Sequence, residues 1–423
     1  MCSMVEEQVR GQEVPEVGCG IVIGIDVSKG WIDWRACRPG QWEKRHHLPQ
    51  DWEGFTSLEQ HLVSRRAQGQ QVWVGLEPTG PYGLCLQEWF LERGWRVVQV
   101  NPYHVHRTKE IPDNSPRKDD EKDPGVIAEL VWRGSYQQVR RVFGPYAELR
   151  AGISEWYSLT KKQTAARNEA QALLEVWFPE VRTLFQDPLC KSVRTLIRHY
   201  ESPEALVRGR LGSLEGRLRE GTHGRGGRYG TALREAAAQS VALREGQRSR
   251  VRALRGLLTQ LEGYEVRREQ LREELAESLA QTREGKYLLS VPLVGVVLAG
   301  GLLGECGPLA EFRRSSQVEK FVGLHLYGLA SGKRTGRLHV SKRGRRGARA
   351  LLGQLAALHV KAGGLCQAWA AEAKGKGKRP LQIQVAVARK FLRVMHALST
   401  REQYFDPKHW HAGAQTADGV PVL

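Results

Sequence analysis

The sequence lacks an apolar run long enough to cross a membrane. Its longest apolar stretch, residues 291–304, contains Pro292 and several glycines and is shorter than the roughly 18 residues that a membrane-spanning helix needs. Residues 1–18 contain acidic and polar side chains where a secretory signal would have an apolar segment. We therefore expect a protein that has no membrane partner and stays in the cytoplasm.

Paired cysteines are also lacking. The 7 cysteines are an odd number, lie far apart and form no C-x-x-C pair, and no histidine pair has zinc-finger spacing. This distribution argues against a disulfide framework and against structural zinc. It fits a reducing compartment.

Acidic residues are few compared with basic ones. Asp+Glu 46 against Lys+Arg 64 gives a formal net charge of +18 and a pI of about 9.8, which favours a polyanionic partner such as nucleic acid. A hydrophobic content of 41% with 12 Trp is too high for a disordered basic tail. The 423 residues are enough for two or three domains of about 100 to 200 residues each. We expect a folded, basic protein that binds nucleic acid.

Residue patterning divides the chain into five segments. These are an N-terminal extension (1–19), a mixed segment (20–145), a helical segment (146–286), a C-terminal segment (287–405) and a tail (406–423). In the mixed segment, three β-rich stretches (21–28, 30–37 and 41–49) are followed by alternating helix and strand patterns. This order predicts a mixed α/β sheet with helices on its faces.

The rest of the chain has helical periodicity. Apolar residues recur at three- and four-residue multiples along two long stretches of the helical segment, which predicts two long helices that pair with each other, as an antiparallel pair or coiled coil, or with a second subunit. The glycine-rich residues 221–230 between them predict a hinge. The C-terminal segment is predicted to be mainly helical, with a basic loop within 328–352 and a helix over 383–398. The fold class is therefore α/β plus α.

Carboxylates stand at the ends of predicted strands. Asp26 ends the first apolar strand, Glu77 ends another, and the acidic residues of 119–123 precede the last helix of the mixed segment. In α/β sheets, ligand-binding and active sites commonly lie at the carboxyl ends of the strands. Mg²⁺ prefers oxygen ligands such as these carboxylates. A single acid at a strand end more often forms a turn, and an acidic cluster before a helix more often caps it. Together they indicate a metal site of the kind that promotes phosphoryl transfer.

Ser331 lies in the glycine- and arginine-rich part of the C-terminal segment. A small hydroxyl among cations is suited to attack on a DNA phosphodiester, because the cations stabilise the developing negative charge. The surrounding cations are Lys333, Arg334, Arg337, Lys342, Arg343, Arg345 and Arg346. No base stands beside the serine, and His339, a metal-bound water or an aspartate could serve. The simpler alternative is a hydroxyl that only contacts phosphate.

Two sets of motifs resemble one known family. GIDVSK around Asp26, LEPTGPY around Glu77 and RKDDEKD before VIAEL are similar to the DEDD pattern of the IS110-family insertion-sequence transposases, also called bridge recombinases. Residues 291–295 and the stretch around Ser331 resemble the C-terminal motifs of the same family. The resemblance extends over roughly residues 20–404 and implies a RuvC-like RNase H fold for the mixed segment.

The resemblance also implies roles for individual residues. Asp26, Glu77, Asp120 and Asp123 would be catalytic ligands of Mg²⁺, for which Mn²⁺ could substitute, and Asp119 is an adjacent alternative to Asp120. Ser331 would be the nucleophile that forms a covalent phosphoserine link to DNA. The family precedent further implies donor and target DNA, a noncoding bridge RNA that pairs with both, and a homodimer or homotetramer. It places the protein in a prokaryotic cytoplasm, associated with the nucleoid during activity.

We therefore expect a DNA transposase that cuts and rejoins DNA strands. One alternative is a RuvC-type metal-dependent nuclease or junction resolvase that uses the acids without the serine. Another is a non-catalytic, nucleic-acid-binding helical scaffold. A sugar-kinase-like ATPase would share the GID motif, but the sequence has no convincing second phosphate loop.

Overall fold

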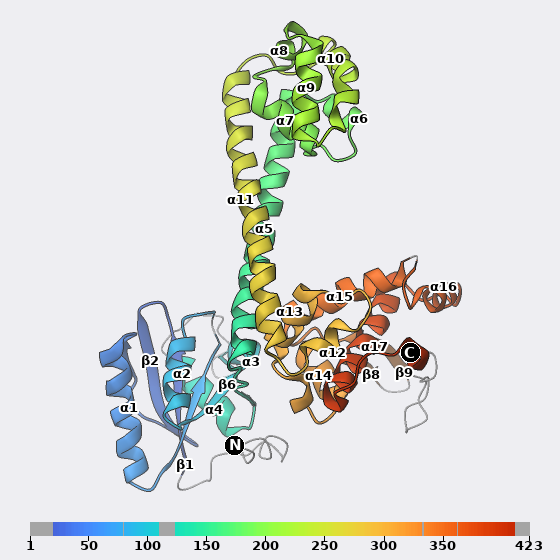
Figure 1. Cartoon of the computed structure of the whole chain (residues 1–423). Helices are drawn as coiled ribbons and strands as arrows, with labels where there is room; N and C mark the ends of the chain where they lie inside the picture. Colours follow the sequence, from blue (N-terminus) through green and yellow to red (C-terminus); the bar gives the residue numbers. More distant parts are fainter. Residues whose placement is uncertain (1–19, 79, 110–122, 332–333, 362, 411–423) are drawn as a thin grey trace. The chain divides into compact units, whose positions relative to one another are not determined.

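The computed structural model describes residues 20–78, 80–109, 123–331, 334–361 and 363–410 (Figure 1). The chain forms two compact units, Met1–Arg141 and Val142–Leu423. No helix in the described part of the chain combines the length and the apolar composition needed to span a bilayer.

The first unit is built on one mixed sheet with the strand order β3-β2-β1-β5-β6-β7, in which β4 also pairs with β2. The strands are β1 (Gly20–Val27), β2 (Trp31–Arg38), β3 (Gln41–Trp42), β4 (His46–Pro49), β5 (Gln71–Leu76), β6 (Arg96–Val100) and β7 (Tyr136–Gln138). Strand β1 pairs antiparallel with β2 and parallel with β5, and β5 pairs parallel with β6. The predicted mixed α/β sheet is confirmed.

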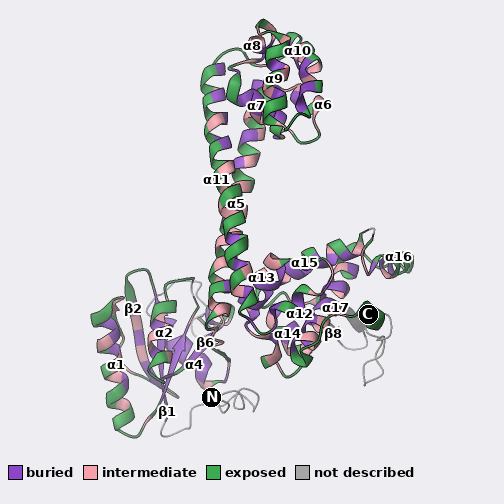
Figure 2. Ribbon diagram, in the orientation of Figure 1, coloured by how far each residue is buried: buried purple, intermediate pink, exposed green. Residues whose placement is uncertain are grey.

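Helices cover both faces of this sheet. They are α1 (Trp52–Ala67), α2 (Leu84–Glu92), α3 (Pro102–Lys109) and α4 (Asp123–Trp132). Alternate residues of β1 point to opposite faces: Ile21, Ile23 and Ile25 pack with α1 and α2, whereas Val22 packs with α4. In Figure 2 much of the central sheet, including β1, is coloured as buried. The sequence pattern did not predict α3 or β7, and the expected third strand over 41–49 is divided into β3 and β4.

Two long helices form the stem of the second unit. Helices α5 (Pro145–Trp177) and α11 (Gln247–Ala280) lie side by side (Figure 1). They run antiparallel, because Leu149 near the start of α5 shares a core with Leu275 and Leu279 near the end of α11, whereas Trp177 shares another core with Val251. The amphipathic stripes of these helices are thus buried against each other within one chain.

A bundle of short helices connects the two long ones. Its elements are α6 (Val181–Leu184), α7 (Lys191–His199), α8 (Pro203–Arg208), α9 (Leu211–Gly221), the 3-10 helix η2 (Gly226–Tyr229) and α10 (Gly230–Ala238). The glycine-rich residues 221–230 are not a hinge, contrary to the sequence-based expectation. A Cβ on Gly226 would lie 2.7 Å from the Leu218 carbonyl oxygen, and one on Gly227 would lie 2.6 Å from Arg219 Nε. These glycines permit close packing of the turn on α9.

The C-terminal part has its own core around α13 and α17, to which the nearby ends of α5 and α11 contribute. Its elements are α12 (Gly285–Leu289), α13 (Val296–Cys306), η3 (Leu309–Glu311), α14 (Ser315–Val322), β8 (Leu326–Ser331), β9 (Arg334–Val340), α15 (Arg346–Val360), α16 (Gln367–Gly375), α17 (Pro380–Arg401) and α18 (Pro407–Trp410). The stretch predicted as a basic loop is instead largely a β-hairpin followed by the start of α15. Strands β8 and β9 are separated by only two residues, which is the connection length most typical of a hairpin.

Candidate functional site

Helix α4 lies on the sheet over two glycines. Gly24 of β1 and Gly75 of β5 are register partners on neighbouring parallel strands. A Cβ on Gly24 would lie 1.9 Å from the Pro124 carbonyl oxygen, and one on Gly75 would lie 2.9 Å from Val131 Cγ2. Only hydrogen atoms fit beneath the helix at these two positions. The contact therefore fixes the first turn of α4 against β1.

This packing brings three of the predicted acids to one corner of the sheet. Asp26 follows Gly24 by two residues and so faces the same side of β1 as α4. The β1–β5 pairing ends at Ile25 and Leu76, so that Asp26 and Glu77 are the next residues along the two strands. Asp123 is the first residue of α4, directly before Pro124. Asp26 and Glu77 are partly exposed, whereas Asp123 is buried.

The donor chemistry of this corner suits a hard divalent cation, because all three side chains offer carboxylate oxygens. However, no three His, Cys, Asp or Glu side chains of the described residues form a group that could hold a metal ion. Asp120 and its adjacent alternative Asp119 lie outside the described residues. The described residues therefore do not by themselves form a metal site, and the role of Asp26, Glu77 and Asp123 as ligands stays a prediction.

The sequence analysis missed a further acid, Asp33, which is the register partner of Asp26 on β2. Directly paired residues on antiparallel strands have neighbouring side chains on the same face. The Asp33 Oδ1 atom accepts hydrogen bonds from Arg45 Nε at 2.9 Å and His47 Nδ1 at 2.8 Å. Arg45 therefore compensates the charge of the second carboxylate beside Asp26. In residues 31–37, buried apolar side chains alternate with more exposed ones. This alternation places Asp33 on the face opposite the buried apolar side chains and is the sequence pattern that could have identified it.

An exposed aromatic pair borders the same corner. Trp31 is 49% exposed and stacks on His47, with ring centroids 4.5 Å apart and an interplanar angle of 22°. His47 is held by its hydrogen bond to Asp33. Trp31 and Asp33 are two residues apart on β2 and so face the same side of the sheet. The corner with the acids therefore has a flat, partly apolar surface next to it.

Ser331 is the last residue of β8 and pairs with Arg334, the first residue of β9. It belongs to the second unit, whereas the acids belong to the first. Lys333 lies outside the described residues, and the side chains of Ser331, Arg334 and Arg337 are likewise outside the description. The backbone places the serine beside the two-residue connection of the hairpin.

The remaining predicted cations follow the hairpin. Lys342, Arg343, Arg345 and Arg346 are all exposed. The backbone that bears them is fixed to the end of α14: the Lys342 N–H donates to the Gly323 carbonyl at 3.0 Å, and the Arg345 N–H donates to the Phe321 carbonyl at 3.1 Å. Exposed cations on a fixed backbone are suited to contacts with phosphates.

Helix α14, which bears these contacts, is anchored by a buried carboxylate. Glu319 is 3% exposed. Its Oε2 atom accepts hydrogen bonds from Arg389 Nη2 at 2.7 Å and Nε at 3.0 Å, and its Oε1 atom accepts one from Arg393 Nε at 2.5 Å. Both arginines belong to α17. The position of the hairpin base therefore depends on an ion-pair cluster between α14 and α17.

Two family models match the chain in the order of its two motif sets. Residues 23–179 match the model of the DEDD transposases of the IS110 type, and residues 285–368 match the model described as the transposase IS116/IS110/IS902 family. The chain belongs to the IS110 family of transposases. The first match includes Asp26, Glu77 and Asp123, and the second includes Ser331 and the basic residues that follow it.

A full-length relative agrees with this assignment. The transposase is 23% identical over 407 residues to a Streptomyces clavuligerus protein described as the uncharacterized 44.8 kDa protein of insertion element IS116. The alignment covers 92% of this chain and 96% of the relative. Membership of the family implies DNA substrates and, for its DEDD domain, a divalent metal.

Proposed function

We propose that this transposase cleaves and rejoins the DNA strands of an insertion sequence by means of a Mg²⁺-binding DEDD site and a serine nucleophile. The observation that supports the proposal best is the arrangement of three acids around one packing contact. Asp26 and Glu77 follow register partners on neighbouring strands, and Asp123 begins α4, which packs on the same strands. The strand order, with an antiparallel β2-β1 pair followed by parallel β5 and β6, supports a RuvC-like RNase H fold.

Asp26, Glu77 and Asp123, together with Asp120, would hold the ion. When bound, Mg²⁺ supplies positive charge that stabilises the phosphate during strand cleavage; Mn²⁺ would substitute. Arg45 pairs with Asp33, so the charge of the carboxylate that lies opposite Asp26 on β2 is compensated. The Trp31–His47 pair offers a surface on which a nucleotide base of the bound strand stacks.

Ser331 would attack the scissile phosphate. Its Oγ forms a bond to phosphorus, the phosphorus–oxygen bond to one deoxyribose breaks, the serine proton passes to a base, and the leaving oxygen takes up a proton. The product is a phosphoserine ester, which a DNA hydroxyl reverses during rejoining. The exposed Lys342, Arg343, Arg345 and Arg346, with Lys333, Arg334 and Arg337, would contact the phosphates of the same strand.

A noncoding bridge RNA would select the donor and target sequences by base pairing. In that arrangement the protein needs only contacts to shape and backbone, which the exposed cations after the hairpin can make. Because Ser331 and the acids belong to separate compact units, we propose that the active assembly is a homodimer or homotetramer with composite sites.

Two substitutions test the chemistry. In an assay of DNA cleavage and strand exchange with Mg²⁺, we expect Asp26→Asn to abolish cleavage. Ser331→Ala should abolish both strand exchange and the covalent protein–DNA adduct seen after denaturing electrophoresis. The matched controls are Glu92→Gln, an exposed acid at the end of α2, and Ser341→Ala, a second serine beside the hairpin. Both controls should retain activity.

The same experiment separates the alternatives. A metal-dependent nuclease would continue to cut DNA after Ser331→Ala and would never form an adduct. A non-catalytic scaffold would be indifferent to Asp26→Asn and to removal of magnesium by a chelator. Sequencing of copurified RNA tests the guide separately: one discrete noncoding RNA supports it, and a random sample of cellular RNA contradicts it.

A further inference from the structure

The helical bundle between α5 and α11 has a hollow of about 590 Å³ on its surface. One wall comes from Phe185 and the start of α7, and the other comes from the glycine-rich turn before and within η2. Three of the eight lining residues, Lys191, His223 and Arg225, are basic, and none of the eight is acidic. The hollow is therefore a site that attracts an anion.

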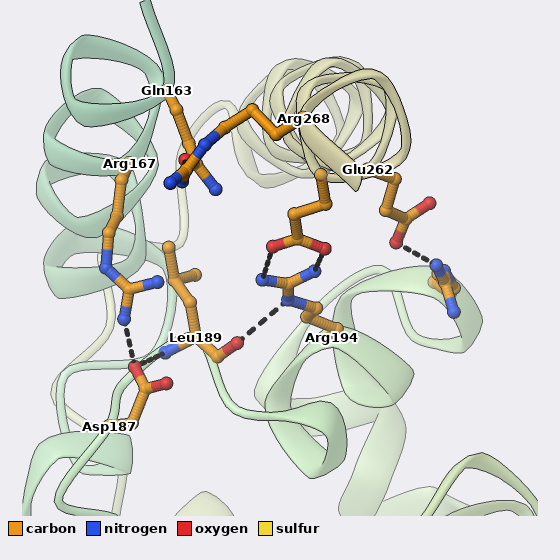
Figure 3. Close-up of polar contacts among 9 residues, drawn as sticks. Gln163, Arg167, Asp187, Leu189, Arg194, Glu262 and Arg268 are labelled. Atoms are coloured by element: carbon orange, nitrogen blue, oxygen red, sulfur yellow. Dashed lines mark hydrogen bonds and ion pairs between the residues drawn. The ribbon is translucent and has the colours of Figure 1, made fainter. Parts of the chain in front are cut away.

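The first wall is held in place by ion pairs to the long helices (Figure 3). Arg194 of α7 donates to both carboxylate oxygens of Glu265 on α11, at 2.8 and 3.1 Å, and its Nε donates to the Leu189 carbonyl at 2.9 Å. Asp187 accepts from the Leu189 N–H at 3.0 Å and pairs with Arg167 of α5. The segment that leads into α7 is thus fixed before any ligand binds.

The second wall is held by Thr222. Its hydroxyl donates to the Leu218 carbonyl and accepts from the Gly226 N–H at 2.6 Å. Gly226 and Gly227 are buried against α9, whereas His223 and Arg225 on the same turn are exposed. The buried glycines therefore leave the two basic side chains at the surface of the hollow.

A hydroxyl lines the hollow at the start of α7. It belongs to Ser192, which is 6% exposed. Ser192 also lies in the first turn of α7, whose N-cap residue Cys190 makes no side-chain cap hydrogen bond, so that the N–H groups of this turn lack an intrahelical acceptor. The N–H groups of this turn are therefore suited to donate hydrogen bonds to an oxyanion.

Aromatic rings stand next to these donors. Phe185 and Tyr229 come from opposite walls, and their ring centroids are 4.8 Å apart. Both rings are half-buried, so that part of each remains accessible. The hollow thus combines cations and a hydroxyl with accessible aromatic surface. These groups match the two parts of a nucleotide, the phosphate and the base.

We propose that this hollow binds one nucleotide of a single-stranded nucleic acid segment. The phosphate lies against Lys191, Ser192 and Arg225, and the base lies against Phe185 and Tyr229. The proposal rests on the proposed function, because the strand is part of the nucleic acid that the transposase handles. It adds a contact region on the bundle to those at the acids and at the hairpin.

The first test measures the affinity of the full chain for short fluorescein-labelled single-stranded RNA and DNA by fluorescence anisotropy. The double substitution Lys191→Gln with Arg225→Gln should weaken binding about tenfold and reduce the slope of log K against log salt by about 1, because phosphate contacts are lost. The matched control, Arg244→Gln with Arg248→Gln, removes two exposed charges of the same unit outside the hollow. Equal weakening by both pairs would overturn the proposal.

The second test is local and does not depend on activity. Cys190 lines the hollow, so its alkylation by iodoacetamide, followed by mass spectrometry, reports occupancy. An oligonucleotide at a few times its wild-type Kd should slow alkylation several-fold in the wild-type chain and in the control pair, but only slightly in the Lys191/Arg225 pair. An unchanged rate in the wild-type chain would overturn the proposal. Equal protection by adenosine monophosphate or inorganic phosphate at the same concentration would overturn the assignment to a strand.

The two proposals fail in different ways. If Asp26→Asn and Ser331→Ala abolish recombination but no oligonucleotide protects Cys190, the hollow is not a nucleic acid site and the proposed chemistry stands. If Cys190 is protected while Asp26→Asn retains full activity, the proposed chemistry is wrong and the binding site on the bundle stands.

Discussion

Gly24 of β1 lies directly beneath Pro124 of α4, so closely that a Cβ on Gly24 would be 1.9 Å from the Pro124 carbonyl oxygen. The two residues are neighbours of two predicted ligands, because Asp26 follows Gly24 by two positions and Asp123 immediately precedes Pro124. The approach of helix to strand therefore sets how near these carboxylates come to each other. A backbone contact between α4 and β1 therefore positions Asp123 relative to Asp26.

Gly24→Ala should displace the first turn of α4 and so disturb the acid corner. Overpacking of a buried contact typically costs about 1 to 3 kcal/mol, and we expect a loss of that size in the free energy of unfolding, measured by chemical denaturation. The rate of DNA cleavage should fall by more than the loss of folded protein explains, because the separation between Asp26 and Asp123 changes.

The control for this substitution is Gly30→Ala. A Cβ at Gly30 meets no atom within 4 Å, so stability and cleavage should stay at the wild-type level. Wild-type cleavage by the Gly24→Ala variant would show that the position of α4 does not matter to the site.

Trp31→Ala should weaken binding of single-stranded DNA to the first unit. Stacking of a base on an aromatic ring contributes about 1 to 3 kcal/mol, so that the full chain should lose roughly tenfold in affinity, as measured by anisotropy. Trp52→Ala is the matched control, because Trp52 is 69% exposed but contacts Trp89 of α2 on the other face of the sheet. Equal affinity of the two variants would argue against a stacking role for Trp31.

Glu319→Ala should destabilise the C-terminal core and the base of the hairpin. The substitution leaves Arg389 and Arg393 without their shared buried partner, which costs about 2 to 4 kcal/mol. The midpoint of thermal unfolding reports the loss. Glu372→Ala, which breaks the exposed Glu372–Lys376 pair on α16, should leave the midpoint unchanged, and an equal loss in both variants would contradict the importance of the buried cluster.

The Arg194–Glu265 pair should make the bundle less stable in acid. The hydrogen bond from Arg194 holds the pKa of Glu265 below its ordinary value. A carboxylate with a lowered pKa in the folded state stabilises the protein above its unfolded pKa of about 4.3, and this contribution is lost as the pH falls through the folded pKa.

Glu265→Gln should therefore lower the free energy of unfolding by about 0.5 to 1 kcal/mol at neutral pH, a value reduced by solvent screening of the partly exposed pair. The difference from the wild type should vanish in strong acid. Denaturant midpoints at the two pH values provide the measurement, with Glu277→Gln, an exposed acid farther along α11, as the control. A difference that persists in acid would show that the pair acts through packing.

The sequence was most informative where local pattern and burial coincide. Alternating apolar residues identified the strands around Asp26 and Glu77, and the long heptad-like stripes identified α5 and α11, because burial of one face requires that spacing. The sequence was least informative where the residues in contact lie far apart along the chain. Asp33 escaped notice because its proximity to Asp26 depends on strand pairing, and the glycines of 221–230 were mistaken for a hinge because their close contacts with α9 do not show in composition.

The basic charge, the residues of the DEDD and serine motifs, and the mixed α/β plus helical organisation follow from the sequence, since each depends on residue type and spacing along the chain. Other features became visible in the folded protein alone. Helix α4 packs on Gly24 and Gly75, and Asp33 and the Trp31–His47 pair border the acids. Ser331 ends a hairpin strand, and a basic hollow lies on the bundle. These features join residues distant in sequence, and their positions depend on close packing and strand register, which no local pattern specifies.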